Sequence, residues 1–288
     1  MDILFMGTAA AEGIPALFCE CEMCKYARKH GGKEIRTRSG ALIDGKIKLD
    51  FCPDSLKHML DYDIDYTHMK TLLVTHTHED HFQLGDITCR RKGFGQIADD
   101  QPPLTVYGNA ALGEMLKPYI CERIAFKQLK PFETVDIEGY AVTALEAVHC
   151  LSGAPNASYP VVFENRAYLR GEEALFYLIE KDGKRILYAH DTDEFTPADM
   201  EFLTGKRCDI ISLDCTNAKL DAEYIGHMGA NDNLRMREKL IAIGAADENT
   251  VFVANHFSHN GMLPHDELEA RMPGFKVSYD GMRLTTGD

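Results

Sequence analysis

The sequence contains no tryptophan and no long uninterrupted run of apolar residues. A membrane-spanning helix needs about 20 mostly apolar residues in a row, so we expect no membrane partner. Residues 1–7 show no basic segment followed by a long apolar run, which argues against a signal peptide. Basic side chains are also scarce, because 31 Lys and Arg face 45 Asp and Glu, giving a formal net charge of −14. That charge disfavours nucleic acid and anionic membranes as partners.

Cysteines are more numerous, with nine in the chain. Six of them stand alone in the sequence, at Cys52, Cys89, Cys121, Cys150, Cys208 and Cys215. Scattered thiols suit a reduced cytoplasmic protein better than a disulfide framework, so we predict a cytoplasmic location. The 288 residues can bury one sizeable core, and no linker or repeat divides them. We therefore predict a single domain over residues 1–288.

Short strand-like runs recur along the whole chain, with helical patterns between them. We expect strands at 3–6, 41–43, 47–51, 72–75, 104–107, 141–148, 175–180, 185–189, 210–213 and 251–254. We expect helices at 22–30, 55–60, 110–116, 231–243 and 265–272. The pairs Asp44-Gly45 and Asp182-Gly183 stand between strand-like runs and predict tight hairpins. The pattern predicts an α+β fold with two packed sheets covered by helices.

Two segments carry further expectations. In the helix at 231–243, Leu234, Leu240 and Ile243 predict a buried stripe. Residues 151–173 form an irregular stretch directly after a strand-like run, and a loop of this length is usually functional. We interpret this stretch as a lid or a dimer-contact loop.

The segment 75–82 concentrates the chemistry of the chain. It reads Thr-His-Thr-His-Glu-Asp-His-Phe and so places three imidazoles and two carboxylates within six positions, directly after an apolar, β-branched run. Such crowding contributes nothing to folding stability, which makes a merely solvated turn the weaker interpretation. Imidazole and carboxylate are the usual ligands of zinc, manganese and iron, so the segment predicts a metal site at a strand end.

The pattern His-x-His-x-Asp-His at 76–81 resembles the metallo-β-lactamase superfamily of binuclear hydrolases. The resemblance implies an αββα sandwich with metal ions at the sheet edges and further ligands at later strand ends. It implies that His76, His78 and His149 hold one ion, that Asp80, His81 and His256 hold a second, and that Asp191 bridges both. Asp80 thereby also takes a catalytic role. Two cations about 3.5–4 Å apart that share a hydroxide serve hydrolysis.

Two neighbours of these candidates are ambiguous from sequence. His190 adjoins Asp191 but would point to the opposite face if the strand persists, so we leave it out of the site. Asp214 ends another strand-like run and would either orient a ligand histidine or lie in a surface turn.

A second group of candidate ligands is the knuckle Cys19-Glu-Cys21-Glu-Met-Cys24. Three thiols this close are poor disulfide partners but good thiolate ligands. The knuckle, the segment 6–16 before it and the closing segment 275–282 resemble the phosphoribosyl cyclic phosphodiesterases of phosphonate breakdown. That resemblance implies a structural zinc held by Cys19, Cys21, Cys24 and His259. It also makes His227 the candidate catalytic histidine, which would protonate the leaving oxygen.

The resemblance favours a metal-dependent phosphodiesterase acting on a small cyclic or linear phosphodiester. It implies two divalent ions in the active site, and their identity is either zinc or manganese. A β-lactamase, thioesterase or glyoxalase-type hydrolase acting on a carbonyl carbon shares the same ligand motif. A tRNA-processing nuclease is disfavoured by the acidity of the chain. A non-enzymatic accessory protein of pyrroloquinoline-quinone biosynthesis resembles the start and the knuckle, but its metal cluster is eroded, whereas this one is complete. A homodimer is a further expectation from the resemblance.

Overall fold

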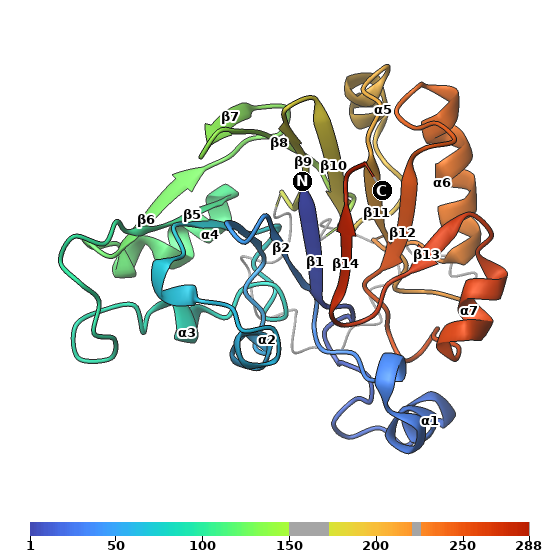
Figure 1. Cartoon of the computed structure of the whole chain (residues 1–288), viewed down its shortest axis with the longest axis horizontal. Helices are drawn as coiled ribbons and strands as arrows, with labels where there is room; N and C mark the ends of the chain where they lie inside the picture. The colour runs from blue at the N-terminus through green and yellow to red at the C-terminus, as the bar shows by residue number, and fades with distance from the viewer. Residues whose placement is uncertain (150–172, 221–225, 288) are drawn as a thin grey trace.

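The computed structural model describes residues 1–149, 173–220 and 226–287, and it contains two seven-stranded sheets (Figure 1). The first sheet contains β1 (Asp2–Gly7), β2 (Gly40–Ile43), β3 (Ile47–Leu49), β4 (Thr71–Leu73), β5 (Leu104–Gly108), β6 (Ile124–Gln128) and β14 (Met282–Thr285). The second contains β7 (Thr134–Ile137), β8 (Tyr140–Glu146), β9 (Leu175–Lys181), β10 (Lys184–Ala189), β11 (Ile210–Asp214), β12 (Val251–Asn255) and β13 (Phe275–Val277). The strand orders are β14-β1-β2-β3-β4-β5-β6 and β13-β12-β11-β10-β9-β8-β7.

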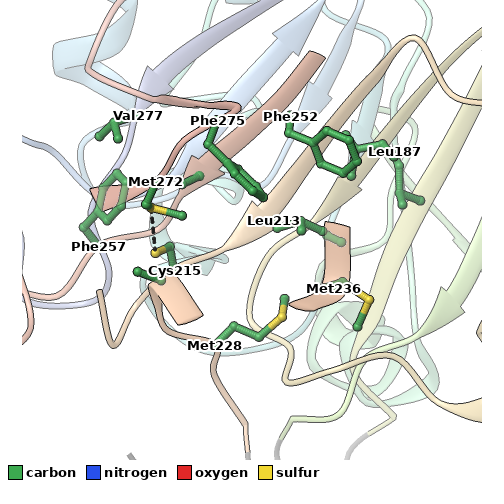
Figure 2. Packing of buried hydrophobic residues seen from close by; sticks show 14 of the residues in the cluster. Leu187, Leu213, Cys215, Met228, Met236, Phe252, Phe257, Met272, Phe275 and Val277 are labelled. Carbon is green, nitrogen blue, oxygen red and sulfur yellow. Dashed lines mark hydrogen bonds between the residues drawn. The ribbon is translucent and has the colours of Figure 1, made fainter. Parts of the chain in front are cut away.

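Helices cover the outer faces of both sheets (Figure 1). The helices are α1 (Glu22–His30), α2 (Ser55–Asp61), α3 (Leu84–Ile87), α4 (Ala110–Leu116), α5 (Pro197–Leu203), α6 (Ala230–Ala242) and α7 (His265–Arg271). Side chains from α3 and α4 pack on the first sheet, and side chains from α1, α5, α6 and α7 pack on the second. Figure 2 shows part of this packing, in which Leu213 and Phe252 of the sheet belong to one buried cluster with Met236 of α6 and with Met272, which follows α7. This αββα arrangement confirms the predicted fold class.

The core between the sheets follows from strict alternation along the strands. In β1, Ile3 and Phe5 face the inter-sheet core, whereas Leu4 and Met6 face the helices on the outside. Both sets are buried, so a strand of this kind reads as an unbroken apolar run rather than as an alternating one. Because both faces of the central strands are buried, their sequences are continuous apolar runs that predict strands.

The expected hairpins are present. Asp44-Gly45 joins the antiparallel strands β2 and β3, and Asp182-Gly183 joins β9 and β10, with positive φ at all four residues. A third hairpin turn of the same kind, Glu138-Gly139 between β7 and β8, was missed because its first residue is Glu.

Among the strands and α-helices of the described residues, six were not expected from the sequence: β6, β7, β13, β14, α3 and α5. Most are only three to five residues long, too short for a periodic pattern. Helix α5 is an exception, because Thr196 and Asp199 form a capping box around Pro197, a signal that the sequence does carry. The predicted stripe of α6 also needs correction. Leu234 and Ile243 are only partly buried, because the buried face includes Asn233, whose amide donates to Asp214 O at 2.7 Å.

Strand directions bring six chain segments to one edge of the sandwich. β3 runs parallel to β4, and β10, β11 and β12 run parallel to one another, with Asp214 opposite Asn255. β8 pairs antiparallel with β9, which pairs antiparallel with β10, so β8 and β10 end at the same edge. Within the described ranges, no helix is long and apolar enough to cross a membrane.

A buried cation lies at the end of β3. Lys48 is fully buried on the helix-covered side, where its Nζ donates to the carbonyl oxygens of Leu49 (3.1 Å) and Asp50. Burial lowers the pKa of Lys48 to about 8, despite the charges of Cys52 and Asp50. The folded state therefore opposes the charged form of this side chain.

We expect Lys48→Met to raise the free energy of unfolding at pH 7 by about 1–2 kcal/mol, since it removes a buried charge at the cost of two hydrogen bonds. Below pH 8 the lysine is charged in both states, so the difference between variant and parent is largest there. Between pH 8 and about 10.5 only the unfolded parent keeps the proton, so parent stability rises and the difference shrinks. Urea unfolding at pH 7 and pH 10 measures both values; a difference that grows with pH would contradict this account.

Candidate metal centre

The predicted ligands come together at the shared edge of the two sheets. His76, His78, Asp80 and His81 follow β4, and His149, Asp191 and His256 follow β8, β10 and β12. All are buried except His78 and Asp80, which are partly exposed. Residues that lie up to 180 positions apart in the chain thus form one cluster.

The first group is a set of three histidines. Nδ1 of His78 lies 2.7 Å from Nε2 of His76 and 3.2 Å from Nε2 of His149. Ligand atoms about 2.1 Å from one ion lie roughly 3.0–3.4 Å from each other, so the spacing fits a single cation. Burial lowers the pKa of His76 and of His149 well below the usual value, which keeps both imidazoles neutral, as metal ligands must be.

The second group combines two histidines and a carboxylate. Nε2 of His81 lies 3.3 Å from Nε2 of His256 and 3.3 Å from Oδ2 of Asp80. His256 Nε2 is 3.9 Å from the same carboxylate oxygen. The three atoms therefore surround a second cation-sized position.

Asp191 lies between the two groups. Its Oδ2 is 2.7 Å from His81 Nε2 and 2.9 Å from His256 Nε2, while its Oδ1 is 3.6 Å from His149 Nε2. Oδ2 is buried, and no well-oriented hydrogen-bond donor faces it among the residues that the structure describes. A carboxylate oxygen buried in this way among imidazole nitrogens needs a cation, so the donor set fits a bridged pair of divalent ions.

The charge balance leads to the same conclusion. Burial would lower the pKa of His81, but the carboxylates of Asp191, Asp80 and Asp50 raise it well above the usual value. The protein atoms alone thus require a positive charge at His81, and a divalent cation would supply it without a proton.

Asp50 is a contributor that the sequence reasoning missed. Its Oδ2 lies 2.8 Å from Nδ1 of His81, and its Oδ1 accepts the N–H (2.8 Å) and the hydroxyl (3.1 Å) of Thr75. The contact keeps the His81 proton on Nδ1 and leaves Nε2 free for a cation. The expected strand 47–51 enclosed Asp50, whereas β3 ends at Leu49, so Asp50 takes the strand-end position that also marks Asp191 only with the observed boundary.

Backbone strain is concentrated at these strand ends. Asp50, Asp191 and His256 have φ values of 57°, 50° and 64°, in the left-handed region that non-glycine residues rarely adopt. Strain of this kind costs of order 1 kcal/mol or more per residue and gathers where a side chain must be held in place for function.

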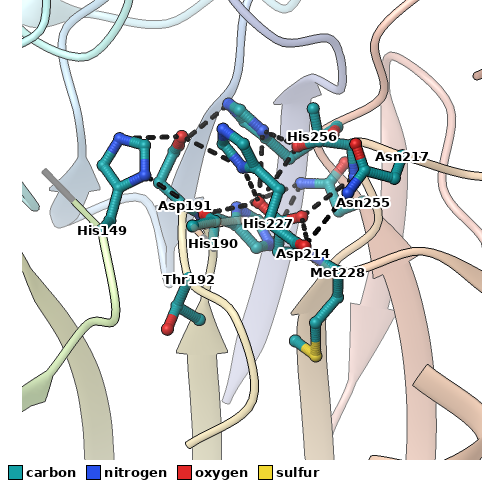
Figure 3. A network of polar contacts seen from close by, with 12 residues as sticks. His149, His190, Asp191, Thr192, Asp214, Asn217, His227, Met228, Asn255 and His256 are labelled. Atoms are coloured by element: carbon teal, nitrogen blue, oxygen red, sulfur yellow. Dashed lines mark hydrogen bonds and ion pairs between the residues drawn. The ribbon is translucent and has the colours of Figure 1, made fainter. Parts of the chain in front are cut away.

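His227, the candidate catalytic histidine, lies in the same network (Figure 3). Its Nδ1 is 3.0 Å from Oδ2 of Asp214, and its ring centre is 4.9 Å from that of His149 and 5.9 Å from that of His256. Burial opposes protonation, but the charge of Asp214 and its hydrogen bond raise the pKa of His227 to about 9. The cationic form therefore prevails at neutral pH in the absence of neighbouring cations.

Asp214 takes the orienting role that the sequence left open. Its Oδ2 accepts from the Asp191 N–H (3.0 Å) and the Thr216 hydroxyl (3.1 Å), and its Oδ1 accepts from the N–H groups of Thr216 (2.9 Å) and Met228 (3.1 Å). Thr216 in turn has its hydroxyl 2.8 Å from Nδ1 of His256. A carboxylate saturated with donors serves as a hydrogen-bond hub rather than as a metal ligand.

His190 lies buried beside the centre. Its Nε2 is 2.7 Å from the hydroxyl of Ser212, and its ring packs 3.9 Å from the ring centre of Tyr188. These contacts agree with leaving it out of the candidate ligand set. Of the expected lid at 151–173, only Glu173 lies within the described residues.

The cysteine knuckle and His259 form a separate cluster. Nδ1 of His259 lies 3.5 Å from Sγ of Cys19 and 3.4 Å from Sγ of Cys21, and all four ligand atoms lie within 4.8 Å of one another. Burial raises the pKa of the Cys21 thiol, but hydrogen bonds from the Cys24 N–H and from His259 outweigh this effect and lower it to about 6. For Cys24, burial and the neighbouring thiolates raise the pKa to about 12. Three thiols and one imidazole at this spacing fit a closed tetrahedral zinc site.

We expect Cys24→Ser to weaken this site and to lower the free energy of unfolding by about 3 kcal/mol, because the energy of a structural zinc is folding energy. Zinc content and urea unfolding measure the two effects. The exposed Cys89 provides a matched control, and Cys89→Ser should change neither quantity. Full zinc retention with unchanged stability in Cys24→Ser would exclude a structural zinc at the knuckle.

Comparison with known proteins is consistent with this architecture. A family profile described as "Beta-lactamase superfamily domain" matches residues 49–257. No curated protein sequence matches the chain significantly. Among solved structures, a diphosphatase from the PhnP family has a TM-score of 0.71 at 21% identity, covering 99% of this chain and 97% of that one.

Two other structures are similar in fold. Zinc-bound PqqB from Methylobacterium extorquens has a TM-score of 0.71 at 18% identity, with 99% and 100% of the two chains covered. The short form of human tRNase Z has a TM-score of 0.64 at 15% identity, with both chains covered completely. At these identities the likeness concerns the fold alone. The profile match spans more than half of the sequence, and the chain belongs to the metallo-β-lactamase superfamily.

Proposed function

We propose that the protein is a binuclear metal-dependent phosphodiesterase that cleaves a small cyclic or linear phosphodiester. The observation that carries this proposal is the His227–Asp214 pair, which stands within 4 Å of the candidate bridging residue Asp191. A protonated imidazole beside the cations suits departure of an alkoxide from phosphorus, which needs a proton. A thiolate departs from a thioester without such a proton, whereas the nitrogen of a β-lactam also needs one, so this pair argues against the thioester alternative alone.

The residues divide the work as follows. When bound, two divalent ions would supply a hydroxide nucleophile near neutral pH and would stabilise negative charge on the attacked phosphoryl group. Asp191 would hold an ion at each of the two cation positions, and Asp80 would complete the second. His227 keeps its Nδ1–H on Asp214 and gives the Nε2 proton to the leaving oxygen, which yields an alcohol and a phosphomonoester.

Neighbouring folds do not decide the substrate. The printed description of one similar structure is a diphosphatase of the PhnP family, which supports a phosphoryl substrate for this chain. The similarity to PqqB suggests the non-enzymatic alternative, but all seven candidate ligands are present and clustered here. The net charge of −14 argues against a tRNA substrate despite the likeness to tRNase Z. A homodimer and a cytoplasmic location stay predictions.

A substrate panel tests the proposal. Purified protein should be loaded with Mn²⁺ or Zn²⁺ and assayed with bis(p-nitrophenyl) phosphate, a cyclic ribose phosphate, a dialkyl diphosphate, an acyl thioester and nitrocefin. We expect turnover of a phosphodiester that is stimulated by Mn²⁺. Turnover of nitrocefin or of the thioester alone would contradict the proposal and would indicate a hydrolase that acts on a carbonyl carbon.

A further inference from the structure

Two residues beyond the candidate ligand Asp191 join its loop to the loop of His149. The Thr192 hydroxyl accepts the N–H of Val148 at 2.9 Å, and the N–H of Asp193 donates to the carbonyl of Val148 at 3.3 Å. Val148 immediately precedes His149. The ends of β8 and β10 are therefore tied together next to the candidate ligand of each.

The side chain of Asp193 extends this connection to a third loop. Its Oδ2 accepts the N–H of Gly226 at 3.4 Å, and its Oδ1 accepts the N–H of Glu194 at 2.8 Å, which fixes the orientation of the carboxylate. Gly226 directly precedes His227. Asn217 holds the other side of that histidine, because its amide donates to the His227 carbonyl at 3.1 Å.

The carbonyl oxygen of Gly226 contacts His149, a candidate ligand of the first cation position. It lies 3.2 Å from Nδ1 of that histidine. A carbonyl oxygen can only accept, so His149 carries its proton on Nδ1 and leaves the Nε2 lone pair for a cation. Gly226 has a φ of 124°, and a Cβ at this position would stand 3.4 Å from His149 Nδ1, so the peptide geometry requires glycine.

We infer that Asp193 is a positioning residue that sets the His149 imidazole and the His227 segment together through the backbone N–H and carbonyl of one residue, Gly226. This inference rests on the proposed function for its consequence in catalysis, but its consequence for cation binding does not. One hydrogen bond from Gly226 orients a candidate ligand, and the other anchors the segment that carries the candidate acid. Partners of this kind usually change metal affinity or activity by about 10–100-fold when removed.

The test compares Asp193→Ala with Asp193→Asn, because the asparagine side chain keeps an oxygen that can accept the Gly226 N–H. Each protein, stripped of chelatable metal, is titrated with Mn²⁺ by calorimetry. We expect Asp193→Ala to bind one of its two ions at least 10-fold more weakly than the parent, and Asp193→Asn to recover most of that loss. With bis(p-nitrophenyl) phosphate, kcat should fall by a similar factor in Asp193→Ala, with a smaller change in KM.

Two further variants keep the test decisive. Gly226→Ala should reproduce the weakened ion even if Asp193→Ala folds poorly, and Glu201→Ala, at an exposed position of α5, should match the parent. Parent-like affinity for both ions in Asp193→Ala, or equal damage in the Ala and Asn variants, would overturn the inference. The titration uses no substrate, so a parent protein that hydrolyses no phosphodiester would contradict the proposed function and leave this result interpretable.

Discussion

Asp191→Ala is expected to lower phosphodiester turnover by about 10³-fold or more. The side chain approaches three candidate ligand nitrogens, on His81, His149 and His256, and it is the only carboxylate of the described site that reaches both cation positions. Charge stabilisation by a cation pair contributes several kcal/mol to the transition state, and each 1.36 kcal/mol corresponds to a tenfold change in rate. Steady-state kinetics and metal analysis measure the loss of turnover and the loss of at least one chelatable ion.

The matched control for this variant is Asp136→Ala, which removes an exposed carboxylate on β7. It should leave both turnover and metal content at the parent values. If Asp191→Ala keeps two chelatable ions and turns over within tenfold of the parent, Asp191 does not bridge the centre.

His227→Ala should lower kcat by about 10²–10³-fold, the usual contribution of a general acid. The loss should depend on the leaving group. A phosphodiester of p-nitrophenol, which departs readily as an anion, should suffer less than an alkyl ester, whose alkoxide needs the proton. Kinetics on the two substrates give the ratio directly.

Metal content distinguishes the acid from a ligand. His227→Ala should retain both chelatable ions, because its Nδ1 is directed to Asp214 rather than to a cation position. The exposed His68 offers a control, and His68→Ala should change neither rate nor metal content. Loss of an ion in His227→Ala would indicate that His227 is a metal ligand. Equal losses of rate on both substrates would contradict its role as the general acid.

The sequence predicted the site best where the chemistry is local. His76 to His81 are consecutive, so their convergence follows from a single strand end. The partners at His149, Asp191 and His256 were reachable because each ends an apolar run, and parallel strands end at a common edge. The resemblance to the superfamily supplied the assignment of each residue to one of the two cation positions.

The supporting contacts were harder to predict. The orienting role of Gly226 belongs to its backbone carbonyl, and a sequence does not show where a carbonyl points. Thr216 acts through a hydroxyl that faces His256, 40 residues away. The strand-end rule did not select Asp50, because the expected strand 47–51 enclosed it and Lys48 interrupts the apolar run there. That lysine is itself an unexpected buried charge, since its polar contacts are also backbone carbonyls.

The fold was predicted where burial is two-sided. Strands such as β1 and β9 are apolar on both faces, since one face meets the other sheet and the opposite face meets helices. The strands β6 and β7 are only partly buried and include exposed residues, and they gave no comparable pattern. Strands β13 and β14 are three and four residues long and are defined by pairing with distant neighbours, which a local pattern does not encode.

We expect the protein to hold a bridged pair of cations together with a separate structural zinc. Elemental analysis of the purified protein, before and after exhaustive treatment with a chelator, measures both. Close to three divalent ions per chain should be present before treatment, and one tightly held zinc should remain afterwards. A single chelator-resistant zinc before treatment, with no further ion bound on addition of Mn²⁺ or Zn²⁺, would rule out the cation pair.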